Sequence, residues 1–188
     1  MPPWFGGRTE VAHRGFAISL PHGWVAFDLA GDIGAQVKVA RARLPDLTGG
    51  DAADLPMRLA QDLAAGVQVL ALDFRAPSGP QHCSIGLPPE GEWQHDRDFA
   101  ETAYRDMLSE AEPPEEVFPP RSARLPSGDA WVIDSANPAQ PGQDHVLQYA
   151  LYMLESHGGA LIGCGGPVRP KDDWLSIVST FEFLPPEE

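Results

Sequence analysis

Three side chains with nitrogen or oxygen donors recur at helical spacing near the middle of the chain. His95, Asp98 and Glu101 stand at positions i, i+3 and i+6, and Asp96 lies beside them. Side chains spaced in this way share one side of a helix, and their donor atoms suit a divalent cation. No second group of donors at ligand spacing accompanies them, and an acidic helix face is ordinarily only solvated. We therefore expect no metal ion, and no sequence motif indicates a cofactor.

Two residues could act as nucleophiles. The segment HCSIG, which contains Ser84, is similar to the nucleophile-elbow motif of hydrolases, but it lacks the first glycine and is predicted to be a strand. Cys164 lies between two glycines and would need a histidine base brought to it by the fold. We expect no catalytic residue in this chain. A small hydrolase-type enzyme with a site assembled by the fold remains the alternative.

An acidic segment runs from residue 90 to residue 116. It contains ten carboxylates and two arginines, so it carries a net charge of −8 out of the −14 of the whole chain. Such a surface repels nucleic acid and anionic lipid and attracts basic protein surfaces. We expect a protein partner that is basic, with no nucleic acid and no membrane insertion. The candidate contacts to this partner are Glu92, Asp96, Asp98, Glu101, Asp106 and Glu110.

The composition indicates one domain over residues 1–188, with an extended arm at 1–12 and a tail at 185–188. Of the 188 residues, 43% are hydrophobic and 20 are prolines, which predicts a real core and a loop-rich domain with short regular elements. No apolar run has the length of a signal peptide or a membrane span, so a cytoplasmic location is expected. The two cysteines, Cys83 and Cys164, cannot build a disulfide framework, and we expect two free, buried thiols.

The first half of the chain alternates between apolar and polar residues as strands do. The alternation predicts a hairpin over residues 15–21 and 24–29, and a third strand over residues 36–44 with Val37 and Val39 on one side. Two antiparallel strands are predicted at residues 67–74 and 81–87. Between these groups we expect a helix that starts at Asp54, ends at Gly66 and buries the stripe Leu55, Leu59 and Leu63.

The second half combines two helices with further strands. A helix is predicted over residues 96–111, with an apolar stripe of Phe99, Ala103 and Met107 that is widened by Tyr104 and Leu108. Up to four strands follow, within residues 117–125, 128–136, 145–154 and 159–164. The last helix begins near Pro170, and its expected buried face is Trp174, Ile177, Val178 and Phe181. The fold class is therefore α+β: a mostly antiparallel sheet flanked by helices.

Short motifs at the two ends resemble those of the PsbP-like superfamily, which also includes the Ran-binding nuclear import factor and the mycobacterial lipoprotein LpqN. Members open with a strand that ends in a Pro-Gly-Trp type of turn and close with a helix that leads into a Ser/Thr-Phe-x-Phe element. The matching residues are Leu20, Pro21, Gly23 and Trp24 at the start and Ser179, Thr180, Phe181 and Phe183 at the end. The resemblance implies an α/β/α sandwich and a role that is usually non-enzymatic. It transfers no catalytic or metal-binding residue.

These observations favour a non-enzymatic, cytoplasmic accessory or adaptor protein, or a chaperone-like module, that binds another protein. The resemblance favours this role, and the sequence contains no convincing catalytic constellation. An immunity-type protein that neutralises a basic partner is a further alternative to the small enzyme. The sequence leaves the oligomeric state open.

Overall fold

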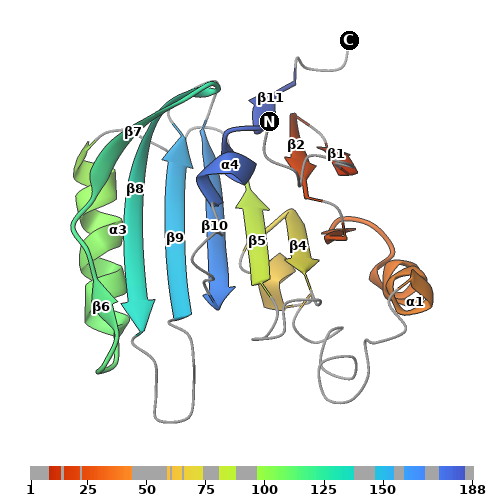
Figure 1. Cartoon of the computed structure of the whole chain (residues 1–188), viewed down its shortest axis with the longest axis horizontal. Coiled ribbons are helices and arrows are strands. Elements are labelled where there is room, and N and C mark those ends of the chain that lie inside the picture. The colour runs from red at the N-terminus through yellow and green to blue at the C-terminus, as the bar shows by residue number, and fades with distance from the viewer. Residues whose placement is uncertain are drawn as a thin grey trace.

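Two antiparallel sheets lie next to each other in the computed structural model of the chain (Figure 1). The structure describes residues 9–13, 15–21, 23–43, 59, 61–64, 66–73, 81–87, 97–137, 147–154, 159–167 and 174–184. The small sheet has the strand order β1 (Thr9–His13), β2 (Phe16–Leu20) and β11 (Glu182–Phe183). The large sheet has the order β3 (Val25–Asp28), β4 (Val69–Asp73), β5 (Gln81–Gly86), β10 (Ala160–Pro167), β9 (Leu147–Leu154), β8 (Gly128–Asn137) and β6 (Glu116–Val117), and β7 (Arg121–Leu125) also pairs with β8. The α+β class and the antiparallel pairing expected from the sequence are confirmed.

One face of the large sheet is covered by the small sheet and by the terminal helix α4 (Trp174–Val178). The ring of Phe16 in β2 stacks on Phe181 with centroids 5.4 Å apart, and Phe183 meets Phe181 edge-on at 5.0 Å. Such aromatic pairs add roughly 0.5–1.5 kcal/mol to the stabilisation that comes from burying their area. The sequence predicts a buried face for this last helix, and the prediction is confirmed for all four of its residues, Trp174, Ile177, Val178 and Phe181.

A hydroxyl group ties the end of α4 to the small sheet. The Ser19 N–H of β2 donates to Thr180 Oγ1 at 2.9 Å, and the Thr180 hydroxyl lies 2.7 Å from the Ile177 carbonyl oxygen, to which it donates. The Thr180 hydroxyl oxygen also lies 3.1 Å from the Ser19 carbonyl oxygen, so both backbone polar groups of Ser19 meet this one side chain. The Ser-Thr-Phe-x-Phe ending thus combines one buried and one partly buried ring with a polar contact between residues 161 positions apart in the sequence.

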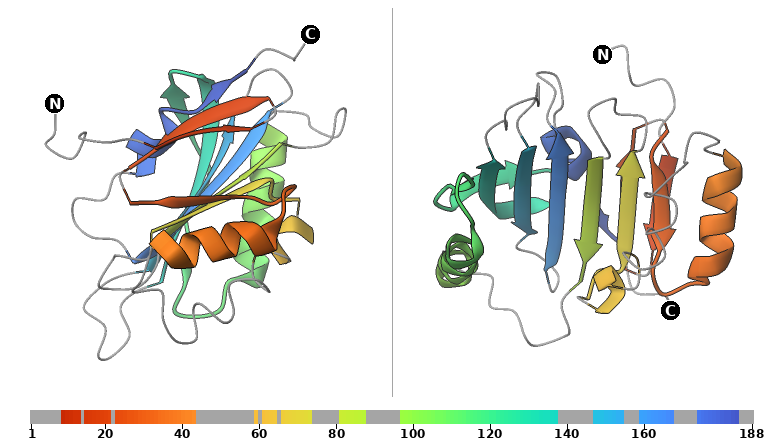
Figure 2. Two further views of the ribbon diagram at one scale, coloured as in Figure 1. Left: turned by 90° about the vertical axis from the view of Figure 1, so that its right-hand side faces the viewer. Right: turned by 90° about the horizontal axis from the view of Figure 1, so that it is seen from below.

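The opposite face of the large sheet is covered at its two ends by different helices (Figure 2). At one end, α3 (Arg97–Glu110) packs on β8 and β9, where Ala100, Ile133 and Met153 form a buried cluster. At the other end, α1 (Ile33–Arg43) buries Val37 among Phe27, Leu70 and Leu72 of β3 and β4. Helices on one face, with α4 and the small sheet on the other, make the expected sandwich. In the described part of the chain, no helix has the length and apolarity that crossing a bilayer requires.

The strand predicted over residues 36–44 is wrong, because residues 36–43 belong to α1 and residue 44 lies outside the described residues. Asp32 caps this helix: its Oδ1 accepts a hydrogen bond from the Ala35 N–H at 3.0 Å. Val37 is buried whereas Val39 is 51% exposed. The two valines therefore do not share a face, as they would in a strand. Ile33 and Val37, spaced i and i+4, are the pair that packs on the sheet.

The predicted hairpin over residues 15–29 has correct strands and a wrong pairing. β2 pairs with β1 and β11, whereas β3 pairs with β4 in the other sheet. The turn from Pro21 to Trp24, with Gly23 at φ +90°, sends the chain from one sheet to the other. The N-terminal arm expected at residues 1–12 includes most of β1, and its first eight residues, like the tail at 185–188, lie outside the described residues.

Two of the predicted apolar stripes are only partly buried. The structure describes residues 59 and 61–64 of the first predicted helix as helical. Leu59 is buried but Leu63 is 44% exposed, and Leu55 lies outside the described residues. Gly66, at φ +85°, ends this turn as predicted, since its N–H donates to the Leu63 carbonyl. On α3, Tyr104 joins the buried cluster's edge, but Leu108 is 50% exposed instead of widening the stripe.

Candidate functional site

Four of the six predicted partner contacts lie on α3, and two, Glu92 and Asp96, lie outside the described residues together with His95. Asp98, Asp106 and Glu110 are exposed. Glu101 is different, because it is half-buried and already paired. Its Oε1 lies 2.7 Å from Arg97 Nε and its Oε2 lies 3.8 Å from Arg105 Nη2. The structure therefore brings the acidic face together on one helix, with Glu101 held between two arginines.

A cleft of about 290 Å³ lies beside this arginine–glutamate–arginine group. Its lining comes from three elements that are distant in sequence. They are α3, the connection from β6 to β7, and the strand β8, and their lining residues are Arg97, Glu101, Tyr104, Arg105, Pro119, Pro120 and Trp131.

Local sequence explains the shape of the cleft. Arg97, Glu101, Tyr104 and Arg105 are spaced i, i+4, i+7 and i+8, so they share one side of α3. The Phe118 N–H still donates to the Asp134 carbonyl at 2.9 Å, but the two prolines that follow have no N–H to donate. Pairing with β8 stops there and resumes at Arg121 in β7. The interruption leaves room beside Trp131.

Trp131 falls within a predicted strand, and no sequence motif singles out Pro119 or Pro120, so the sequence does not predict the cleft. The sequence shows the two arginines four residues before and after Glu101, and this spacing predicts ion pairs on the outer face of the helix. The double proline at the edge of a strand is the signal that could have indicated an interrupted ladder. What no local pattern shows is that Trp131 of β8 lies under the same helix face.

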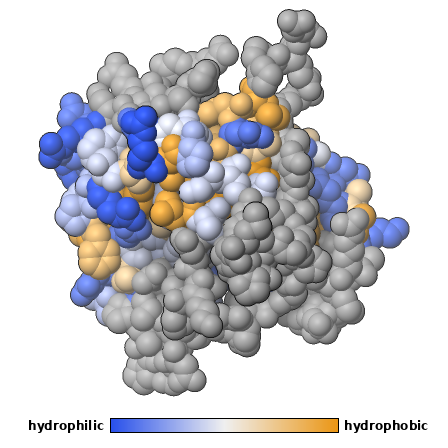
Figure 3. Space-filling view, turned by 45° about the horizontal axis from the view of Figure 1, so that its top comes forward, coloured by the Kyte–Doolittle hydropathy of each residue, from blue (hydrophilic) through white to orange (hydrophobic). Residues whose placement is uncertain are grey.

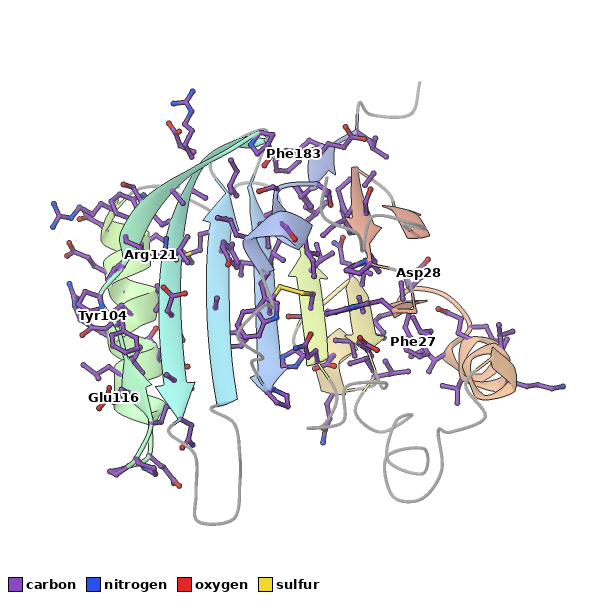
Figure 4. The ribbon with its side chains drawn as sticks, viewed as in Figure 1. Phe27, Asp28, Tyr104, Glu116, Arg121 and Phe183 are labelled. Atoms are coloured by element: carbon purple, nitrogen blue, oxygen red, sulfur yellow. A yellow bond between two sulfur atoms is a disulfide. The ribbon has the colours of Figure 1, made fainter. Side chains whose placement is uncertain are left out.

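The charge along this end of the molecule is unevenly distributed. Both arginines of the cleft stand in the first nine residues of α3, while residues 106–120 contain five carboxylates and no lysine, arginine or histidine. Figure 3 shows hydrophilic side chains gathered on the side of the molecule that carries α3, β6 and β7. Figure 4 shows Tyr104 on α3 and Glu116 on β6, both at the same outer edge of the large sheet.

The two candidate nucleophiles are engaged in bonds. Cys164 of β10 lies directly opposite Cys83 of β5, with the Cα atoms 4.2 Å apart, and the two form a disulfide. The expectation of free thiols is therefore wrong: both cysteines point to the same face of adjacent strands, which no local pattern reveals. Ser84, on the other face of β5, donates to the Gly163 carbonyl oxygen at 3.2 Å. Neither side chain has a histidine among its hydrogen-bond partners in the described part of the chain.

A polar group of side chains lies on the sheet between α3 and α1. His82 and Ser84 of β5 and Tyr149 of β9 flank Gly163 and Gly165 of β10, and the rings of His82 and Tyr149 are 6.4 Å apart. Burial raises the pKa of the Tyr149 phenol above its usual value of 10.0. These rings cover a glycine strand, and their close contact with it explains why both glycines lack a side chain.

No protein-family model and no curated protein matches this sequence. Among solved structures, the chain is similar to the solution structure of cyanobacterial PsbP from Synechocystis sp. PCC 6803. The TM-score is 0.48 over 98% of this chain and 96% of that chain, at 12% sequence identity. The resemblance to the PsbP-like superfamily rests on the motifs at the two ends and not on this structural similarity. At this identity and TM-score it carries no argument about what the chain binds or does.

Proposed function

We propose that the chain is a non-enzymatic accessory or adaptor protein that binds a basic protein partner through the face made by α3 and the connection from β6 to β7. The observation that carries this proposal is the cleft beside Glu101, because aromatic, proline and arginine side chains meet there in a concave, partly exposed site. Aromatic residues and arginine are enriched at protein interfaces and among the few residues that supply most of the binding energy. Two apolar side chains on the same part of the chain, Leu108 and Phe118, are 50% and 45% exposed.

Electrostatics supports a basic partner. The five carboxylates within residues 106–120 form the most one-sided charge run among the described residues, and the whole chain carries −14. A field of this sign raises the rate at which a cationic surface reaches the site, and the effect falls as salt rises. An immunity-type role would use the same face. It would differ in that binding blocks the active site of a basic partner enzyme.

The acidic run includes the C-terminal end of α3, where negative charge destabilises a helix. Glu110 stands in the last turn of α3 and no basic residue accompanies it there. Negative charge at a helix C-terminus opposes the helix dipole and costs roughly 0.3–1 kcal/mol per group at low salt. Retaining carboxylates at a cost in stability is what a binding surface requires, because the partner's positive charges offset the repulsion only in the complex.

Glu110→Lys is expected to have opposite effects on stability and on binding. It should raise the free energy of unfolding by a few tenths of a kcal/mol, measured by thermal or urea denaturation, because it replaces an unfavourable charge by a favourable one. It should also weaken partner capture. Glu182→Lys on β11 is the matched control, since it makes the same change in net charge at an exposed site in the other sheet.

The partner itself is identified by photo-crosslinking in the native host. A photoreactive amino acid replaces Leu108 or Phe118 on the proposed face, and Val39 or Leu175, which are 51% and 42% exposed elsewhere, serve as controls. We expect one protein of net positive charge to be trapped from positions 108 and 118, and less of it in the Glu110→Lys background. Equal trapping from all four positions, or trapping only from 39 and 175, would refute the proposed face.

The disulfide bears on where the chain works. Disulfides persist in oxidising compartments and are rare in the cytosol. The cytoplasmic location predicted from the sequence stays a prediction, and the Cys83–Cys164 bond weighs against it. We infer an oxidising compartment. Acid quenching of intact cells, followed by alkylation under denaturing conditions, should leave both cysteines unlabelled. Full labelling of both cysteines would show that they are reduced in the cell and that the chain works in a reducing compartment.

A further inference from the structure

We propose that the cleft between α3 and Pro119–Pro120 binds a carboxylate joined to a flat apolar group, as in the C-terminal residue of a peptide or a small aromatic acid. The juxtaposition behind this inference is a pair of guanidinium groups, Arg97 and Arg105, at the rim of a cavity floored by Tyr104 and Trp131. The inference rests on the proposed function, because it assigns a ligand group to a cleft on the same face of the molecule. It is tested separately from the identity of the partner.

The guanidinium groups have donors to spare. Arg97 uses only Nε, in its 2.7 Å bond to Glu101, so both of its terminal nitrogens are without a partner among the described residues. Arg105 approaches Glu101 no closer than 3.8 Å, which is beyond hydrogen-bond length. A carboxylate is the acceptor whose planar shape matches such a group, and it can take two parallel N–H donors from one arginine.

Glu101 gives this pair of arginines its geometry. Because one carboxylate attracts both guanidinium groups, Glu101 draws them toward the same side of α3 from positions four residues before and four residues after it. It also neutralises one of the two positive charges, which leaves the rim of the cleft at about +1. A cationic lysine or arginine of a partner is therefore repelled at this point, although the neighbouring residues 106–120 attract it.

The floor of the cleft suits a flat apolar body. Tyr104 and Trp131 are half-buried, and both contact the cluster around Ala100 and Ile133 that fixes their positions. Pro119 and Pro120 add two further apolar side chains to the lining. The volume of about 290 Å³ is at the lower end of the range for ligand pockets, so the site holds a single ring or side chain. A carboxylate on that group would then reach the arginines at the rim.

The test compares two probes that differ only in the carboxylate. N-acetyl-tryptophan and N-acetyl-tryptophanamide are titrated into uniformly ¹⁵N-labelled protein, and the resonances of the Trp131 indole and of the arginine side chains are followed. We expect the acid to bind at least five times more tightly than the amide. Arg97→Gln and Arg105→Gln should each lower the affinity for the acid by roughly tenfold, the loss typical of one charge-assisted hydrogen bond.

A control variant and a second pair of probes complete the test. Arg124→Gln removes an arginine of another exposed ion pair, with Asp129, and should leave the affinity unchanged. A six-residue peptide that ends in tryptophan, with a free or an amidated C-terminus, separates the two sources: tighter binding of the free-ended peptide than of N-acetyl-tryptophan assigns the site to a peptide end. Equal shifts with acid and amide, or full affinity in both arginine variants, would overturn the inference. The proposed partner-binding face, tested by crosslinking from positions 108 and 118, does not depend on this result.

Discussion

Replacing both Cys83 and Cys164 by alanine is expected to lower the free energy of unfolding by about 4 kcal/mol. The two residues are 81 positions apart, and closing a loop of that length in the unfolded chain accounts for about 4.5 kcal/mol in the chain-entropy relation. For a chain of this size, a loss of this magnitude lowers the melting temperature by roughly 8–18 °C. Circular dichroism during heating, with and without reductant, measures the change.

The position of the bond explains why the loss should be global. β5 and β10 form the junction at which the strands from residues 25–86 meet the strands from residues 116–167, and the disulfide crosses that junction. Both sulfur-bearing residues are fully buried beneath α4 and the small sheet. Reductant should destabilise the natural chain by the same amount and leave the double variant unaffected. Equal melting temperatures for the oxidised chain and the double variant would show that the bond contributes nothing.

Gly163→Ala is expected to lower the free energy of unfolding by about 3 kcal/mol. A methyl group at this position would lie 3.0 Å from Ser84 Oγ and from Tyr149 Cζ, and closer still to the Tyr149 hydroxyl oxygen. Inserting a methyl group into a packed site of this kind costs roughly 1–3 kcal/mol, and the upper end applies because β10 is held on both sides by β5 and β9. Urea denaturation measures the difference.

A second variant separates crowding from other causes. Gly163 does not have a positive φ, so the backbone accepts alanine and only the neighbouring side chains oppose it. Removing the hydroxyl in the double variant Gly163→Ala, Tyr149→Phe should recover part of the loss, and a double-mutant cycle gives the coupling between the two positions. The same reasoning applies to Gly165, where a methyl group would meet His82 Cε1 at 2.6 Å. Unchanged stability of Gly163→Ala would mean that the rings move aside freely.

The candidate site was only partly accessible from the sequence. The spacing of Arg97, Glu101 and Arg105 predicts their ion pairs, and the charge run predicts an acidic face at this helix. The cleft needs Pro120 and Trp131 as well, and these reach α3 through the pairing of β6, β7 and β8. Glu101 stays a predicted partner contact, and the structure adds that it lies between two arginines.

The errors in the fold share a physical cause. Residues 36–44 have apolar side chains at positions that fit a strand as well as a helix, and the cap at Asp32 with the burial of Val37 against β4 decides for the helix. β2 could pair with its neighbour β3 on local grounds. It pairs instead with β1 and with β11, where Phe183 lies opposite Phe16, and the ring of Phe181 just before β11 stacks on Phe16.

Local patterns were sufficient for most of the elements, though not for α1 or β1: they gave the period of apolar residues in α3 and α4, the alternation in the other strands, the stop at Gly66 and the acidic character of one helix. These features depend on residues within about ten positions of one another, so they can be read directly. The order of strands, the Cys83–Cys164 bond and the cleft at Trp131 depend on contacts between residues that are dozens of positions apart. Such contacts are selected by the burial of the whole chain at once, because each strand has several partners that satisfy its own backbone equally well.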